Sequence, residues 1–130
     1  MRAPGVLEAF GTVRAGAYDI GRLAERYTDV DLAGIEDSYS HRNRHTAKVL
    51  ARISGRWQQA FEHHGVATTF VAAKTWQHAI LSLSPRAKRD ERKAAAKAFA
   101  RSAYGVKAPT EDEADSICLA TYLVSVGVPG

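Results

Sequence analysis

The sequence contains one cysteine among its 130 residues, so no disulfide can form within the chain. Cys118 lies between Ile117 and Leu119 in an apolar helical pattern, which predicts an inert, buried thiol. We therefore expect a reduced, cytoplasmic environment.

Long apolar runs are also absent. No segment approaches the ~20 apolar residues that cross a bilayer. The N-terminal stretch MRAPGVLEAFG is interrupted by Glu8 and lacks the long hydrophobic region of a signal peptide. Hydrophobic residues make up 45% of the chain and charged residues 25%, as in soluble globular proteins. The length favours a single domain over residues 1–130, with one core and one site.

Acidic residues are missing from residues 41–56, which contain five Lys or Arg and two His. A second segment, 86–107, has eight Lys or Arg against Asp90 and Glu91. The acids gather instead in residues 29–37 and 111–115, while the formal net charge is +4. Basic segments around an acidic spot indicate phosphate contacts near a cation-binding centre, although solvated helix faces would give the same pattern.

Apolar periodicity predicts strands alternating with helices. Strand patterns cover 5–16, 31–37 and 66–73, the second of them typical of a buried strand. Helix patterns cover 18–27, 44–65, 75–83, 87–105 and the stretch that begins at 113. We expect Ile20, Leu23 and Tyr27 on the apolar side of the first helix. This alternation predicts an α/β fold with helices packed on a small sheet that is thin for its helices.

The last helix begins with TEDEADSICLATYL, residues 110–123, which places four carboxylates in five positions. Thr110 and Glu113 fit a capping box, and first-turn acids suit the helix dipole. Capping does not explain Asp115, which shares a face with Asp112 and lies next to Leu119 rather than on the opposite polar side. Two carboxylates on one face repel unless a cation or a proton lies between them, so both a cap and a metal site remain open. The expected apolar side comprises Ile117, Leu119, Ala120, Leu123 and Val124.

A further acid, Glu36, ends the apolar run LAGIE and should project from the C-terminal end of a strand. Ligands of open α/β sheets bind outside the carboxyl ends of the strands. Glu36 opposite Asp112 and Asp115 could form an oxygen site for Mg²⁺ or Mn²⁺. Asp37 is a poorer candidate because consecutive strand residues point to opposite sides.

Three blocks in this order resemble the RuvC-type Holliday-junction resolvases (crossover junction endodeoxyribonucleases) of the RNase H-like superfamily. The blocks are DLAGIEDSYSHRNRHTAKVLARISG, TTFVAAKTWQHAILSLSPRAKRDERKAAAKAFARSAYG and DEADSICLATYL. The last block is similar to the family's D-x-x-D helix and is the most specific of the three. The resemblance covers roughly residues 5–125 and implies an RNase H-like, RuvC-like fold with a small mixed sheet.

The resemblance implies a metal-dependent endonuclease acting on branched DNA. Glu36, Asp112 and Asp115 match the family's metal-binding carboxylates, and Lys93 falls where the family has a lysine near the scissile phosphate. The family uses Mg²⁺ or Mn²⁺, as two ions in an intact site, and works as a homodimer on junction DNA. The expected contacts to the DNA backbone come from Arg42, Arg44, Lys88, Arg89, Arg92 and Lys97. A family of this kind implies the cytoplasm of a bacterium, or of the host if a phage encodes the chain.

The chain departs from the family at its start. The family's first strand has the form G-x-D-x-G/S, and its Asp bridges both metal ions. The printed sequence resembles the family only from the second strand, so we expect a fold that lacks the first strand and its catalytic Asp. Glu8 does not replace that Asp by pattern. Two alternatives to an active nuclease stay open: a catalytically inactive RNase H-like domain that binds DNA or protein, and a truncated gene model.

Overall fold

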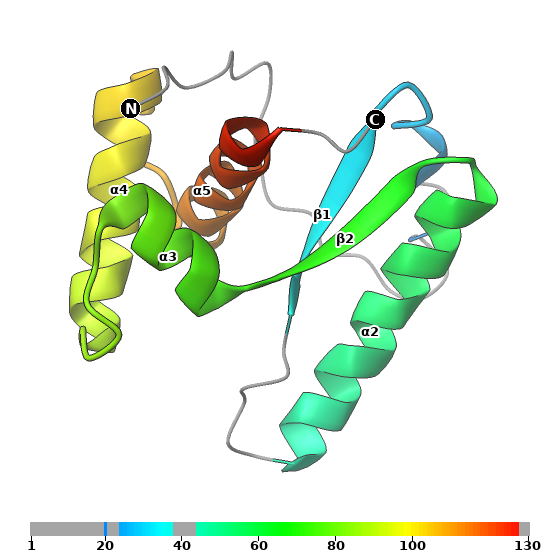
Figure 1. The fold of residues 1–130 in the computed structure, drawn as a ribbon, viewed down its shortest axis with the longest axis horizontal. Helices are drawn as coiled ribbons and strands as arrows, with labels where there is room; N and C mark the ends of the chain where they lie inside the picture. The colour runs from blue at the N-terminus through cyan, green and yellow to red at the C-terminus, as the bar shows by residue number, and fades with distance from the viewer. Residues whose placement is uncertain (1–19, 21–23, 38–43, 128–130) are drawn as a thin grey trace. The chain divides into compact units, whose positions relative to one another are not determined.

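The computed structural model describes residues 20, 24–37 and 44–127. Its elements, in chain order, are strand β1 (Leu32–Asp37), helix α2 (Arg44–His63), strand β2 (Ala67–Ala72) and helices α3 (Ala73–Leu81), α4 (Arg89–Tyr104) and α5 (Glu111–Val126) (Figure 1). The protein is therefore of the α/β class, as the sequence predicts. None of the helices in the described ranges combines the length and apolar character needed to cross a membrane.

The described chain divides into two compact units, one ending at Ala72 and the other beginning at Ala73. We name them the βαβ unit (described residues up to 72) and the helical unit (residues 73–127). Each is described by itself below.

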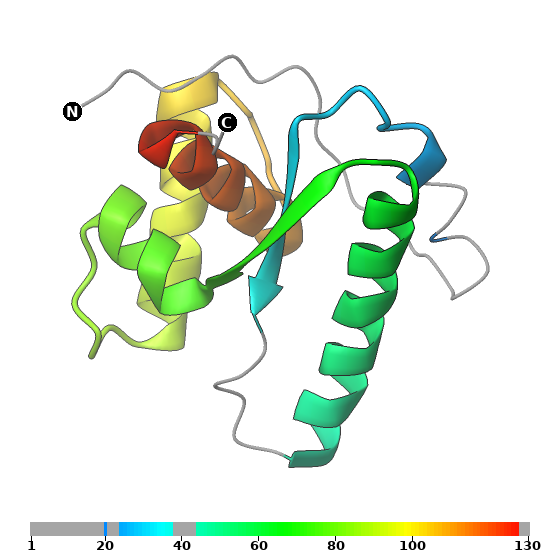
Figure 2. The same ribbon diagram turned by 45° about the vertical axis from the view of Figure 1, so that its right-hand side comes forward.

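The βαβ unit is built on a parallel pair of strands joined by α2. Leu32 pairs with Ala67 at one end and Asp37 with Ala72 at the other. Parallel strands need a long crossover connection, which α2 supplies while packing on both strands (Figure 2). Gly65 follows the helix with a φ of 78°, which allows the chain to turn back into β2.

Strand β1 is less buried than its sequence predicts. Leu32 and Ile35 are half-buried, and Glu36 is exposed. Full burial of a parallel strand requires cover on both faces. In the described part of this unit, β1 has one neighbouring strand and one helix packed on it, so the expectation of a buried strand was wrong.

In the helical unit, α3, α4 and α5 pack against one another (Figure 1). Ala100, Val106 and Ile117 form a buried cluster against which Tyr104 packs. Trp76 of α3 is 1% exposed and therefore belongs to the core of this unit. Of the alanines of α4, Ala96 and Ala100 are buried in this packing.

The buried face of α5 differs in part from the prediction. Its buried residues are Ala114, Ile117, Cys118, Leu119 and Thr121. Ala120 is exposed and Val124 is 53% exposed, so their assignment to the apolar side was wrong. Residues 114, 117, 118 and 121 follow the i, i+3, i+4, i+7 spacing of one helix face, and a small threonine fits where a larger apolar residue was expected.

The remaining element predictions differ mainly at their ends. Ile20, Ala24 and Glu25 are helical but Tyr27 lies in a turn and is 50% exposed, so its assignment to the apolar side was wrong. Helix α3 ends at Leu81, before Ser82, which has a φ of 53°. The predicted strand at 5–16 lies outside the described residues.

Candidate functional site

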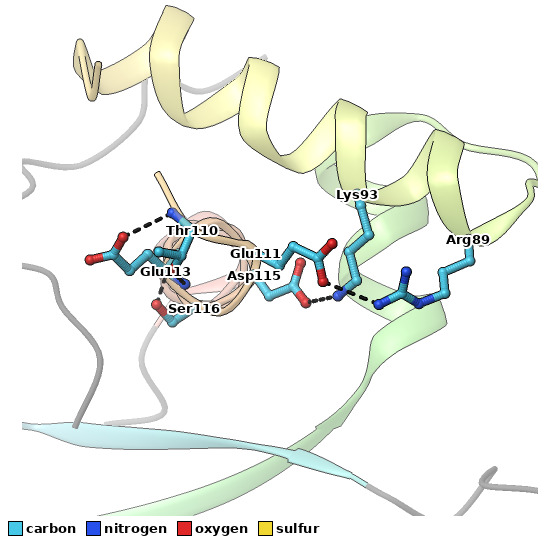
Figure 3. Close-up of polar contacts among 7 residues, drawn as sticks. All are labelled: Arg89, Lys93, Thr110, Glu111, Glu113, Asp115 and Ser116. Atoms are coloured by element: carbon cyan, nitrogen blue, oxygen red, sulfur yellow. Dashed lines mark hydrogen bonds and ion pairs between the residues drawn. The ribbon is translucent and has the colours of Figure 1, made fainter. Parts of the chain in front are cut away.

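The start of α5 is fixed by the capping box that its sequence predicts. The Thr110 hydroxyl accepts a hydrogen bond from the Glu113 backbone N–H (3.2 Å), and the Glu113 carboxylate accepts one from the Thr110 N–H (2.9 Å). Figure 3 shows Thr110, Glu113 and Ser116 together on one side of the helix. These contacts satisfy backbone donors that a helix start leaves open. Thr110 and Glu113 are therefore structural.

Glu111 and Asp115 lie on another side of α5 and meet two cations of α4 (Figure 3). Lys93 Nζ lies 2.5 Å from Asp115 Oδ2, and Arg89 Nη2 lies 3.1 Å from Glu111 Oε2. The acids are four residues apart on one helix and the cations four apart on the other. One turn of each helix therefore faces one turn of the other, which ties their N-terminal ends together.

The two ion pairs differ in their shielding from water. The side chains of Lys93 and Asp115 are 26% and 21% exposed, against 64% and 42% for Arg89 and Glu111. Exposed pairs contribute little because water and salt screen them. The Lys93–Asp115 pair is thus the stronger electrostatic tie. It joins two residues that the sequence predicts to be catalytic.

Asp115 also influences the buried thiol one turn along α5. Burial, with a smaller contribution from the Asp115 carboxylate, raises the pKa of Cys118 to about 12. Cys118 is 0% exposed. The predicted burial of the thiol is confirmed, and its low reactivity stays a prediction.

Asp112 lies one turn before Asp115, about 60° around the helix axis. Its side chain is exposed and makes no hydrogen bond or ion pair with any residue of the described ranges. An exposed carboxylate without an internal partner is available to a cation. Asp112 and Asp115 thus form a pair in which one member is internally bonded and the other faces solvent.

Glu36 occupies the second-last position of β1, where it pairs in register with Val71. Its exposed side chain therefore stands at the carboxyl edge of the parallel pair, the position that the sequence predicts. Glu36 belongs to the βαβ unit and the two aspartates to the helical unit, so the convergence of all three remains a prediction. No group of three or more His, Cys, Asp and Glu side chains suited to a metal occurs within the described ranges.

The basic residues expected to contact DNA differ in their exposure and in their contacts within the chain. Arg89 pairs with Glu111, and Arg92 Nη1 donates to the Ala87 carbonyl at 2.7 Å. Lys88 precedes α4 and is exposed, and Lys97 is half-buried. Arg44 opens α2 and is exposed, whereas Arg42 lies outside the described residues. Arg89 and Arg92 of α4 are therefore already bonded to other groups of the chain.

One polar contact of the helical unit was missed by the sequence analysis. Thr121 Oγ1 donates to the Ile117 carbonyl (2.8 Å) and lies 2.7 Å from the Tyr104 hydroxyl. This joins the C-terminal end of α4 to the buried face of α5. The sequence feature that could have predicted this contact is the threonine at 121, which shares a helix face with Ala114 and Ile117, where apolar residues are expected.

No protein-family model and no curated protein matches the chain.

Proposed function

We propose that the protein is a metal-dependent endonuclease of the RuvC type that cuts branched DNA, with an RNase H-like fold and a homodimeric assembly. Glu36, Asp112 and Asp115 bind the metal in this proposal, and Lys93 is the cationic residue beside them. The parallel strand pair with Glu36 at its carboxyl edge supports it, as does the carboxylate pair at the start of α5.

The observation that carries the proposal is the contact between Lys93 and Asp115. The carboxylate pattern of α5 singles out Asp115, whereas the family resemblance singles out Lys93. These two residues, 22 positions apart, are partners in the structure. A lysine next to a metal-binding carboxylate is well placed to neutralise charge that develops on a phosphate.

The donor set fits Mg²⁺ or Mn²⁺, because all three candidate ligands are carboxylates and these cations prefer oxygen ligands. Glu36 and Asp112 would hold the ions, and Asp115 would be a further ligand or accept a hydrogen bond from a water beside them. Ions held there would supply an activated water and charge stabilisation at the leaving 3′-oxygen. Lys93 holds Asp115 in place through their contact and is the cation that would neutralise charge on the scissile phosphate.

The test is cleavage of a labelled four-way junction in Mg²⁺ or Mn²⁺ by the wild type and by Asp112→Asn and Asp115→Asn. We expect nicking by the wild type and its loss in both variants. Glu111→Gln is the matched control, because it removes one negative charge from the same helix turn without touching a proposed ligand. Equal cleavage by all four proteins would contradict the assignment of the site.

A second candidate is a catalytically inactive domain that binds DNA. The Lys93–Asp115 ion pair favours this candidate, because Lys93 already neutralises Asp115. In this candidate, the Lys93–Asp115 and Arg89–Glu111 pairs only hold α4 and α5 together. Junction binding by the wild type without cleavage, in Mg²⁺ and in Mn²⁺, is the result that this candidate predicts.

A further inference from the structure

Helix α2 carries a row of four basic residues spaced four apart: Arg44, Lys48, Arg52 and Arg56. We name these residues the α2 basic row. Residues four apart are neighbours on a helix, with a rise of about 6 Å per step and about 18 Å along the whole row. All four side chains are exposed.

The row lies on the side of α2 opposite its half-buried aromatic residues. Trp57 and Phe61, whose rings stack at 5.9 Å, are half-buried in a unit where α2 packs against β1 and β2. The 3.6-residue period places the centre of the row about 180° around the helix from these two rings. The row is thus a surface of the βαβ unit that the packing of α2 leaves open.

Among the described residues, no acid forms an ion pair with these four side chains. Helix α2 has no acidic residue before Glu62. Like charges four residues apart repel, and Arg44 at the first position opposes the helix dipole. In α4, by contrast, Arg89 and Lys93 meet acids of α5. The α2 basic row therefore destabilises its own helix, a pattern that an external anionic partner explains.

Gly55 gives a second, independent indication. It lies on the same face, one residue before Arg56, and a Cβ built at this position would meet nothing within 4 Å. Packing within the chain therefore does not require glycine here, although glycine is unfavourable inside a helix. Close approach of an external backbone does account for it.

We propose that the α2 basic row binds the phosphate backbone of a nucleic acid. The identity of the partner rests on the proposed function, and the inference adds the surface that holds it. The row contains no aromatic residue, so it makes phosphate contacts without stacking on bases and without selecting a sequence. A membrane surface fits less well, because the apolar residues of α2 are mostly covered: Trp57 and Phe61 are half-buried, and Val49, Leu50 and Ile53 are 37–39% exposed.

The test is binding of the full chain to duplex and four-way-junction DNA in EDTA, measured over a range of salt concentrations. Lys48→Gln/Arg52→Gln should bind about tenfold more weakly than the wild type, and its salt slope should fall by about 2. Arg26→Gln/Lys74→Gln removes the same charge from exposed positions outside the row and should leave both values unchanged. Because the Lys48/Arg52 substitutions relieve repulsion, that variant should fold at least as stably as the wild type.

Gly55→Leu separates binding from folding. Leucine favours helix over glycine, so this variant should be at least as stable in urea, yet it should bind DNA several-fold more weakly. A stable Gly55→Leu protein with wild-type affinity would contradict the close approach proposed for this face.

The remaining outcomes separate this inference from the proposed function. A Lys48/Arg52 variant that binds and cleaves junctions like the wild type overturns the role of the row and leaves the nuclease proposal standing. A wild type that binds no DNA overturns both. Row-dependent binding to anionic phosphatidylserine vesicles, with none to DNA, would identify a membrane partner and overturn the inference.

Discussion

At the scale of single residues, Asp115 has two roles to reconcile. Its side chain is 21% exposed and bonded to Lys93, and it lies close enough to Cys118 to raise the pKa of the thiol. The ion pair with Lys93 stabilises the fold whether or not Asp115 binds a metal. In the proposed function the same contact keeps Asp115 oriented and supplies a cation to the phosphate. The two roles make different predictions for stability and for cleavage.

A double-mutant cycle measures the structural role. Lys93→Met and Asp115→Asn, singly and together, should give a coupling free energy of about 0.5–1 kcal/mol in urea unfolding, because the pair is partly shielded from water. The matched cycle with Arg89→Met and Glu111→Gln should give about 0.2 kcal/mol, since that pair is more exposed. Equal coupling in the two cycles would contradict the ranking by burial.

Cys118 predicts a pH dependence with a definite sign. Its folded pKa of about 12 lies above the ordinary value of 9.0, so the folded protein holds the thiol proton more tightly than the unfolded chain. The resulting stability is complete below about pH 9 and is lost as the pH rises toward 12. Comparing the free energy of unfolding of the wild type and Cys118→Ala from pH 8 to 11 should show the difference shrinking in this direction. A difference that grows with pH would contradict the raised pKa.

The same thiol should resist modification. At pH 8.5 a disulfide reagent should react with Cys118 far more slowly in the folded protein than in urea, because the thiol is buried and protonated. Reaction at equal rates in the two conditions would place the thiol at the surface.

At the scale of elements, α5 depends on its first turn. Thr110 and Glu113 satisfy each other's backbone N–H groups, which holds Glu111, Asp112 and Asp115 in register with α4. Thr110→Ala should lower the free energy of unfolding by about 1 kcal/mol, measured by urea denaturation. Ser116→Ala is the control, because its hydroxyl only donates to the Glu113 carbonyl within the helix and should change stability by less than about 0.5 kcal/mol.

At the scale of the whole molecule, the sequence predicts more of the fold than of the site. Helices α2, α4 and α5 and strand β2 follow from apolar periodicity and end signals such as Thr110 and Gly105. The half-burial of β1 did not follow, because burial depends on which elements cover a strand rather than on the strand's own residues. The exposure of Val124 has the same origin: a helix pattern gives a face, but its neighbours decide how far that face is covered.

The sequence predicts the site only in part. Local pattern identifies the capping pair and isolates Asp115, and Lys93 was expected nearby from the resemblance. That Lys93 rather than Arg92 meets Asp115 depends on the register between α4 and α5, which packing fixes and a single helix pattern does not. Glu36 lies at the strand end where the sequence predicts it. That Glu36 and the two aspartates converge stays a prediction, because they belong to different units of the chain.

The central claim is that Glu36, Asp112 and Asp115 bind one metal centre, and Mn²⁺ titration of isotope-labelled protein followed by NMR tests it most directly. Bound Mn²⁺ broadens amide signals near it. We predict broadening at low Mn²⁺ concentrations both around Glu36 in β1 and around Asp112–Asp115 in α5, with loss of both effects in Asp112→Asn and in Glu36→Gln. Broadening confined to one of these segments, or unchanged in either variant, would contradict a shared metal site.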